Sequence, residues 1–274
     1  MKSSAMEDIT SLTPTICKLM KISNPSLSGN NFLKLVIKAA KQKLGIKPVD
    51  KCLIYFPDAI GIVLYRNRQS AFKHVLKYAP IVMPLLSVFK PVTPVCCASL
   101  FTGAAPKTHG ILKYEKPILY CDTLFDSLIR SGKKIAIVTV ADSSMDHLFR
   151  NRDIDYFSEI YDEQVIKRTI ELIKSNKHDF IIAYNQEYDD AMHITTPQSP
   201  RALKAMENHI KSFSKIAHVF DKELNHYNRS IIFISDHGAH IDLKTGKGTH
   251  GENIPEDMFL QHFFGISKSE RSER

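Results

Sequence analysis

The sequence predicts an α/β fold in which helices cover both faces of a mostly parallel central sheet. Two observations carry this prediction: strand-like apolar runs recur along the chain, and helical patterns of ten residues or more separate them. The composition agrees, because 43% hydrophobic and 24% charged residues among 274 are typical of globular proteins and exclude disorder, collagen or a coiled coil as the main plan. We expect one domain over residues 1–266 and a charged, disordered tail at 267–274.

Six segments have the length and apolar character of strands. They are Lys51–Phe56, Pro80–Phe89, Lys134–Val140, Asp179–Tyr184, Arg229–Ser235 and Met258–Phe264. The clearest helix runs from Pro200 to about Tyr227, where apolar residues recur every three or four positions and Ser199 fits an N-cap. A second helix is predicted over Glu163–Ser175, and a loop over Ser23–Asn31. No apolar run approaches the roughly 20 residues that a membrane span needs.

Charge and cysteine content narrow the choice of partner and compartment. The net charge is 37 − 29 = +8, but the lysines are scattered and no aromatic-basic motif appears, which argues against nucleic acid as a partner. Five cysteines form no CxxC pair, and the N-terminus lacks the form of a secretory signal, so we expect reduced thiols and a cytoplasmic protein.

Polar residues follow four of the predicted strands, and His250 lies in a loop further along the chain. In open α/β sheets ligands bind beyond the carboxyl ends of the strands, so these side chains should converge. The converging set contains three Asp, three His and one Thr: Asp58, Thr93, Asp189, His193, Asp236, His237 and His250. Imidazole and carboxylate are ligands that zinc accepts, and seven donors suit two divalent ions that each keep an open position, with Mn²⁺ as an alternative metal.

Each of these residues has an ordinary structural explanation when taken singly. An Asp after a strand usually caps a helix or a turn, and a lone His is more often a surface or core residue than a ligand. Thr93 before Pro94 is a good N-cap for a helix over Val95–Thr102. Their joint occurrence at successive strand ends favours the metal site.

Four separate motifs, in order, resemble the alkaline phosphatase superfamily. The segment Thr93–Gly103, followed by Pro106–Ile111, is similar to the nucleophile region of its type I phosphodiesterase/nucleotide pyrophosphatase branch. The other matching blocks are Phe56–Asp58, Asp189 to His193, and Ser235–Gly238 with His250 and Gly251 behind it. The likeness extends from about Lys51 to Phe264, and it implies a three-layer α/β/α fold.

The resemblance also implies roles for individual residues. Asp58, Asp236 and His237, with the Thr93 oxygen, would hold one metal, and Asp189, His193 and His250 the other. Thr93 would be the nucleophile that forms a phosphothreonine intermediate, because a dication favours the alkoxide of a weakly nucleophilic hydroxyl.

The remaining expectations concern substrate contacts. Cys96 stands where phosphodiesterase members usually carry an asparagine that supports the phosphoryl oxygen, and a thiol is a poor donor. His240, and with it His109, lies near the ligands in sequence and is a second candidate for contact with substrate. Five lysines flank the motifs and could attract an anionic substrate: Lys107, Lys113, Lys116, Lys244 and Lys247.

The sequence thus predicts a metal-dependent hydrolase of phosphoric esters, acting on phosphodiester or pyrophosphate bonds or on monoesters of a small anionic substrate. Phosphonate or sulfate ester hydrolysis and phosphomutase chemistry on the same scaffold are alternatives, although Pro91-Val92-Thr93-Pro94 lacks the CxPxR-like run of formylglycine sulfatases. A non-catalytic binder of anions or nucleic acid is the alternative outside enzymes; its binding would weaken steeply with salt and need no metal.

Overall fold

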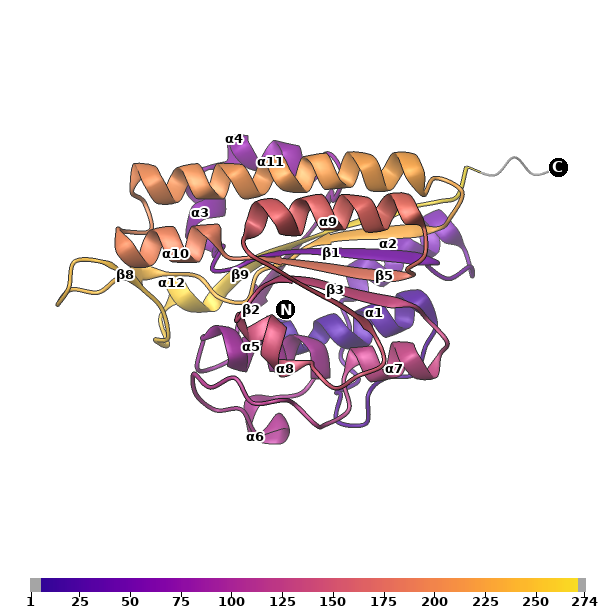
Figure 1. Cartoon of the computed structure of the whole chain (residues 1–274), viewed down its shortest axis with the longest axis horizontal. Helices are drawn as coiled ribbons and strands as arrows, with labels where there is room; N and C mark the ends of the chain where they lie inside the picture. Colours follow the sequence, from indigo (N-terminus) through magenta and orange to yellow (C-terminus); the bar gives the residue numbers. More distant parts are fainter. Residues whose placement is uncertain (1–5, 271–274) are drawn as a thin grey trace, which may run out of the picture.

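A seven-stranded sheet forms the middle layer of the computed structural model, which describes residues 6–270 (Figure 1). The strand order is β2-β9-β6-β1-β5-β3-β4, and all pairings are parallel except those of β9, which runs antiparallel to both β2 and β6. The strands are β1 Lys51–Pro57, β2 Ile81–Leu86, β3 Ile135–Val140, β4 Asp155–Glu159, β5 Phe180–Asn185, β6 Arg229–Phe233 and β9 Phe259–Ser267. A separate hairpin pairs β7 His240–Ile241 with β8 Gly248–Thr249.

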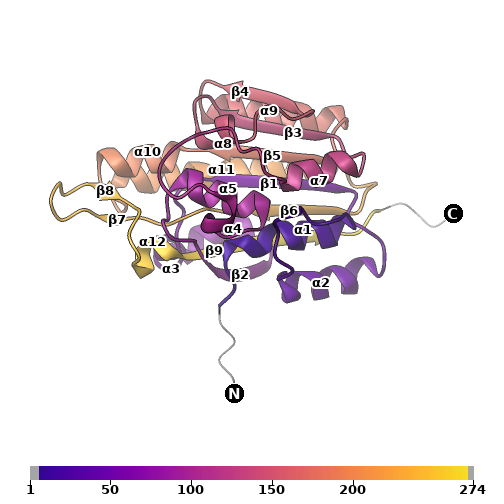
Figure 2. The ribbon, with the colours of Figure 1, turned by 90° about the horizontal axis from the view of Figure 1, so that it is seen from below.

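Helices cover both faces of this sheet, as Figures 1 and 2 show from two sides. One layer contains η1 Ile9–Ser11, α1 Leu12–Met20, α2 Lys34–Leu44, α5 Thr93–Thr102, α6 Pro106–His109, α7 Leu124–Arg130 and α8 Ser144–Leu148. The remaining helices are α3 Ile62–Asn67, α4 Gln69–Leu76, α9 Asp162–Ser175, α10 Glu187–Ile194, α11 Pro200–Glu223 and α12 Pro255–Met258. The predicted mostly parallel α/β fold is confirmed.

Alternation along the central strand explains the two cores. Every residue of β1 is buried, and successive side chains point to opposite faces. Ile54 and Phe56 join the core beneath α1, α5 and α7, whereas Leu53 and Tyr55 join the core beneath α4, α9 and α11. The sheet is therefore anchored from both sides, and its carboxyl edge is held rigidly where the site lies.

The six predicted strands are present, each shifted by a few residues at most. The prediction missed β4, because this strand lies at the sheet edge, its residues are exposed or only partly buried, and they give no apolar run. Helix α11 begins at Pro200, and the Ser199 side chain accepts the N–H of Ala202, as expected of an N-cap. The loop at 23–31 is confirmed as well.

The C-terminal expectation needs a correction. Ser267 is the last residue of β9, and the N–H groups of Ser269 and Glu270 donate to Asn228 Oδ1 and Asn225 O at 3.1 and 2.8 Å. Residues 267–270 therefore lie in the fold rather than in a disordered tail, because backbone pairing continues past the last apolar residue. Positions 271–274 of the expected tail lie outside the described residues.

Two further expectations can be compared with the structure. Within residues 6–270, no helix combines the length and the apolar character that crossing a membrane requires. All five cysteines are free thiols, four of them buried and Cys121 partly exposed.

Gly265 in β9 provides a test of how tightly the sheet packs. A Cβ at this position would lie 2.0 Å from Tyr78 O and 2.9 Å from Ile231 Cγ2. We expect Gly265→Ala to lower the free energy of unfolding by about 1–3 kcal/mol, as overpacked cores do, in urea denaturation. The control is Gly29→Ala, whose Cβ would meet its nearest atom at 3.8 Å and should change stability by less than about 0.5 kcal/mol. Equal stability of the two variants would contradict the close approach.

Candidate metal centre and nucleophile

The predicted ligands meet at the carboxyl edge of three adjacent strands, β6, β1 and β5. Asp58 follows β1, and Asp236 and His237 follow β6. Helix α10, which follows β5, carries Asp189 and His193 four residues apart, so both lie on one helical face. The carboxyl ends of parallel neighbours lie at one edge, and for that reason side chains more than a hundred residues apart in sequence converge here.

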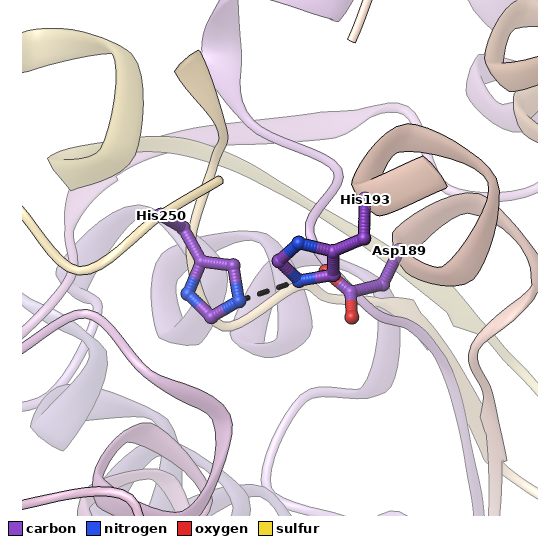
Figure 3. Close-up of side chains that lie close together, drawn as sticks. All are labelled: Asp189, His193 and His250. Atoms are coloured by element: carbon purple, nitrogen blue, oxygen red, sulfur yellow. Dashed lines mark ion pairs between the residues drawn. The ribbon is translucent and has the colours of Figure 1, made fainter. Parts of the chain in front are cut away.

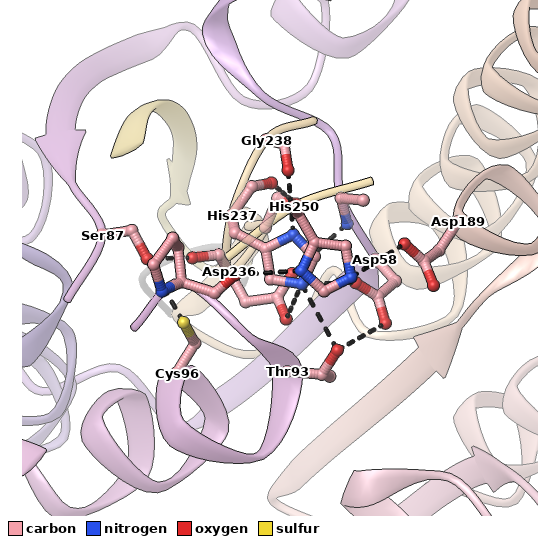
Figure 4. A network of polar contacts seen from close by, with 12 residues as sticks. Asp58, Ser87, Thr93, Cys96, Asp189, Asp236, His237, Gly238 and His250 are labelled. Atoms are coloured by element: carbon pink, nitrogen blue, oxygen red, sulfur yellow. Dashed lines mark hydrogen bonds and ion pairs between the residues drawn. The ribbon is translucent and has the colours of Figure 1, made fainter. Parts of the chain in front are cut away.

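Asp58, Asp236 and His237 form the first cluster (Figure 4). Their ligand atoms all lie within 4.8 Å of one another, and none of the three residues is more than 2% exposed. His237 Nε2 lies 3.4 Å from Asp58 Oδ1 and 3.3 Å from Asp236 Oδ2. This cluster therefore forms the buried floor of the site.

The second cluster consists of Asp189, His193 and His250 (Figure 3). Asp189 Oδ1 lies 3.4 Å from His193 Nε2 and 3.7 Å from His250 Nε2. The two clusters adjoin, because the ring of His250 stacks on that of His237 with a centroid separation of 3.8 Å. Six of the seven predicted ligands thus form two neighbouring triads.

The three imidazoles share one tautomer. Their Nδ1 atoms lie 3.0–3.1 Å from main-chain carbonyls: Gly238 O for His237, Gly248 O for His193 and Pro91 O for His250. A carbonyl can only accept, so Nδ1 carries a hydrogen in each ring, and in the neutral imidazole Nε2 is left with a lone pair directed at the carboxylates. A nitrogen lone pair that faces a carboxylate is repelled by it unless a cation lies between them. The hydrogen bond from Nδ1 to a carbonyl is also the usual support of a metal-bound histidine.

Three carboxylate oxygens of the site are buried without a donor. Asp58 Oδ1, Asp189 Oδ1 and Asp236 Oδ2 accept no hydrogen bond from any residue in the range 6–270. Each unsatisfied buried acceptor costs roughly 1–3 kcal/mol, so three of them together require compensation. Carboxylate oxygens and imidazole nitrogens are a donor set that zinc-type ions accept, and the residues therefore fit two such ions.

Burial raises the pKa values of two acids in the first cluster, and a bound cation would reverse this shift. Burial, and then the charge of Asp236, raises the pKa of Asp58 well above its ordinary value, and burial raises the pKa of Asp236 to about 7. Burial, together with His237, lowers the pKa of His250 to about 3, so this ring is neutral and able to act as a ligand. The acids of the first cluster are therefore electrostatically strained until positive charge enters it.

Thr93 is the first residue of α5, and Val92 is the N-cap residue. Its hydroxyl lies 3.4 Å from Asp58 Oδ2 and 3.3 Å from His237 Nε2, beside the first cluster. The N-cap explanation of Thr93 is therefore wrong, because the helix starts one position earlier than that explanation requires and the hydroxyl faces the acids.

The start of α5 also leaves backbone donors available. The N–H of Cys96 donates to Val92 O, whereas the N–H groups of Thr93 and Val95 meet no acceptor among residues 6–270.

A pocket of about 580 Å³ opens over Thr93 and the second cluster. Asp236 and His237 do not line it, because they lie beneath. Its outer wall is formed by Tyr114, Lys116, Ala141, Asp142, Ser143, Ser144, Gln186 and Asp190. Lys116 is held in place because its Nζ donates to Asp142 O at 2.6 Å. Apart from Lys116, sequence reasoning missed this wall, which comes from loops that carry no periodic or spacing signal.

Two of the expected substrate contacts do not reach this pocket. Cys96 is fully buried, and its Sγ lies 3.2 Å from Ser87 Oγ inside the core, so it cannot take the place of a substrate-binding asparagine. The expectation for His240 is also corrected: its Nδ1 lies 2.8 Å from Asp257 Oδ1, and it lines a different pocket with Val63 and Ile254.

His109 and four of the lysines lie away from the pocket too. His109 Nε2 lies 2.9 Å from Ser99 Oγ, and burial lowers its pKa to about 4. Lys107, Lys113, Lys244 and Lys247 do not line the pocket either. Lys116 is therefore the one member of the five predicted lysines that could attract substrate within it.

This fold, with a threonine at the start of a helix and two acid–histidine triads at the carboxyl edge, defines the alkaline phosphatase-like class, as the sequence predicted. The sequence model described as type I phosphodiesterase / nucleotide pyrophosphatase matches residues 63–247, well over half of the chain. The chain belongs to this family. The match includes Thr93, Asp189, His193, Asp236 and His237, whereas Asp58 and His250 lie outside it and are placed by the structure.

Solved structures support the fold at low sequence identity. Murine ectonucleotide pyrophosphatase / phosphodiesterase 5 aligns with a TM-score of 0.59 and 18% identity over 71% of this chain and 59% of its own. Phosphonoacetate hydrolase from Sinorhizobium meliloti aligns at 0.53 and 16%, over 70% and 57%. The C-terminal periplasmic domain of EptC from Escherichia coli aligns at 0.52 and 16%, over 82% and 74%.

The chain therefore spans less than three fifths of the length of the first two of these proteins. Among curated protein sequences, none matches the chain.

Replacement of Asp236 tests the electrostatic strain. In the unfolded chain its carboxyl ionises near pH 4, roughly the value of a free Asp, whereas in the fold the pKa is raised to about 7. Between these values the folded protein holds a proton that the unfolded chain has lost, so wild-type stability falls as pH rises through the window. In EDTA, we expect the stability of Asp236→Asn relative to wild type to grow from pH 4 to 7, reaching on the order of 1 kcal/mol or more at pH 8.

Urea denaturation at pH 5 and pH 8 measures this difference. The exposed Asp153 supplies the control, since Asp153→Asn should change stability by less than about 0.5 kcal/mol at both values. A difference between Asp236→Asn and wild type that shrinks with rising pH would show that the Asp236 carboxylate is not strained in the metal-free protein.

Proposed function

We propose that the chain is a metal-dependent hydrolase of phosphoric esters, cleaving phosphodiester or pyrophosphate bonds or monoesters through a phosphothreonine at Thr93. The observation that carries this proposal is the position of the Thr93 hydroxyl, 3.3–3.4 Å from His237 and Asp58 and open to the pocket. Family membership supports it. So does a solved structure of the murine protein, in which an inactive threonine-to-alanine form is in complex with AMP.

Asp58, Asp236 and His237 would hold one divalent ion beside Thr93, and Asp189, His193 and His250 the other, with Zn²⁺ or Mn²⁺ as the expected metals. Bound dications would lower the pKa of the hydroxyl and neutralise charge on the phosphoryl group. The donor-free oxygens of Asp58, Asp189 and Asp236 support this assignment.

The residues of the chain then account for the two chemical steps. Thr93 Oγ1 attacks phosphorus, the bond from phosphorus to the leaving oxygen breaks, and the hydroxyl proton departs on the side of Asp58 Oδ2. Tyr184 Oη donates to that same oxygen and fixes the carboxylate. The free N–H of Val95 at the start of α5 donates to a phosphoryl oxygen. Water from the open pocket, on the side of Asp189, then breaks the phosphothreonine bond.

Substitution of Thr93 tests the nucleophile. We expect Thr93→Ala to lower kcat/KM on an aryl phosphodiester by about a thousandfold or more, and Thr93→Ser to retain a larger part because its hydroxyl remains. In a brief reaction, phosphate should be found on the peptide that contains residue 93 by mass spectrometry. EDTA should abolish turnover of the wild type, and Zn²⁺ or Mn²⁺ should restore it.

Thr102→Ala is the matched control, because Thr102 is buried on the same helix and its hydroxyl donates to Ala98 O. It should lose stability and keep turnover. Full activity in folded Thr93→Ala would exclude the mechanism. Salt-sensitive binding without metal or turnover would favour the non-catalytic alternative, and turnover confined to phosphonates or sulfate esters would move the proposal to those substrates.

Lys116 is expected to select substrates with a charged leaving group. Its Nζ is fixed on Asp142 O at the pocket wall and lies 5.7 Å from the centroid of the Tyr114 ring. We expect Lys116→Ala to raise KM about tenfold for a substrate with a pyrophosphate bond, whose leaving group is a charged phosphate, since one such charge contact is worth roughly 1.4 kcal/mol. The change should be smaller for a diester with a neutral aryl leaving group. Steady-state kinetics on the two substrates measures the split.

Lys113→Ala is the control, because the Lys113 side chain is largely exposed and pairs with Glu115 at 3.6 Å outside the pocket. An equal rise in KM for both substrates in Lys116→Ala would assign Lys116 a structural role instead.

A further inference from the structure

The first residues of α10 are held by side chains from two other helices. The N–H groups of Gln186 and Glu187 donate to the two carboxylate oxygens of Asp162, at 2.9 and 3.1 Å. The next N–H, that of Tyr188, donates to His209 Nε2 at 3.1 Å. Asp162 begins α9 and His209 lies within α11. Helix α11 runs beside α10, and the start of α9 meets the start of α10 (Figure 1).

This arrangement replaces the capping that α10 lacks within its own sequence. The first N–H groups of a helix have no partner inside it, and Gln186, the N-cap residue, offers no side-chain cap. A helix of eight residues is also too short to be stable alone. In addition, Asn208 Nδ2 donates to Glu187 Oε1 at 2.8 Å. The orientation of α10 is therefore set by α9 and α11.

The hydrogen bonds of His209 define the tautomer of its ring. Because Nε2 accepts the N–H of Tyr188, the ring hydrogen lies on Nδ1, which faces Tyr55 Oη at 3.2 Å and Asp162 Oδ2 at 3.7 Å. Burial lowers the pKa of His209 to about 3, so the ring remains neutral. Asp162, His209 and Tyr55 thus form one connected, buried network beneath the start of α10.

Burial in this network is unfavourable for the ionised carboxylate of Asp162. Burial raises its pKa to about 7, although two backbone N–H groups donate to it. A cap on the surface would satisfy the same N–H groups without that cost. The buried position is what allows one carboxylate to bridge α9 and the start of α10, and it suggests a geometric role beyond helix stability.

The geometry points to such a role. Asp189 directly follows Tyr188, and His193 lies one turn further along the same short helix. We propose that Asp162 and His209 are positioning residues for the second cluster: they fix α10 so that Asp189 and His193 converge with His250 on one cation. This inference rests on the proposed function, because it requires that the second cluster binds metal.

The test uses the full chain and Zn²⁺ in competition with a chromophoric chelator. Wild type should show two bound ions. His209→Phe, which removes the acceptor, and Asp162→Asn, which keeps one acceptor oxygen, should each weaken one ion about 10–100-fold and leave the other unchanged. His209→Gln carries an acceptor oxygen of similar reach and should recover most of the lost affinity.

The control is His178→Phe, which removes another buried histidine, one that contacts Asp155 at 2.7 Å where β4 and β5 begin, at the edge of the sheet opposite the site. It should lower stability and leave both Zn²⁺ affinities unchanged. A second readout needs no metal: amide hydrogen exchange in EDTA should accelerate over residues 186–194 in His209→Phe, but not over α5.

The possible failures are distinguishable. Wild type that binds no Zn²⁺ would refute the metal site of the proposed function and, with it, this role. Wild type that binds two ions, with unchanged affinities and amide exchange in folded His209→Phe, would refute the positioning role alone. An equal loss of affinity in His178→Phe would also refute it, since general destabilisation would then explain the effect.

Discussion

Uncompensated negative charge at one edge of the sheet is the constraint on which the rest of this structure depends. Three Asp residues bury an oxygen without a donor there, and three His residues aim lone pairs at the same space. Such an arrangement is unfavourable in an empty protein, because desolvation penalises each charge and repulsion adds to it. The fold supports it through a sheet whose central strand is buried on both faces. Rigidity and electrostatic strain thus come from the same architecture.

The strand pattern and the convergence of the seven side chains could be predicted from the sequence, since both follow from local features. Buried parallel strands appear as continuous apolar runs, and the residue after such a run lies at the carboxyl edge whatever the details of the loops. Asp58 and Asp236 were found in this way. Thr93 was ambiguous, because a single-position shift of the helix start changes a capping hydroxyl into one that faces the acids.

What the sequence did not reveal depends on contacts between distant segments. Cys96 lies three residues after Thr93, yet the turn of α5 directs its thiol into the core towards Ser87. His240 follows His237 closely, but a buried partner, Asp257, draws it away from the pocket. The Asp162–His209 network joins residues 47 positions apart in sequence through backbone N–H groups. Because all residues except proline have a backbone N–H, these contacts leave no motif in the sequence.

The two clusters differ in their access to the pocket, and this difference sets the order in which a substrate would meet them. Asp189, His193 and His250 line the pocket together with Thr93, whereas Asp236 and His237 lie beneath it. A substrate entering past Tyr114 and Lys116 therefore meets the second cluster and the Thr93 hydroxyl first, and reaches the buried triad only through that hydroxyl and Asp58. The stacked rings of His237 and His250 link the buried triad directly to the pocket-lining one. The placement of α10, which carries Asp189 and His193, therefore bears on the buried floor as well as on the second cluster.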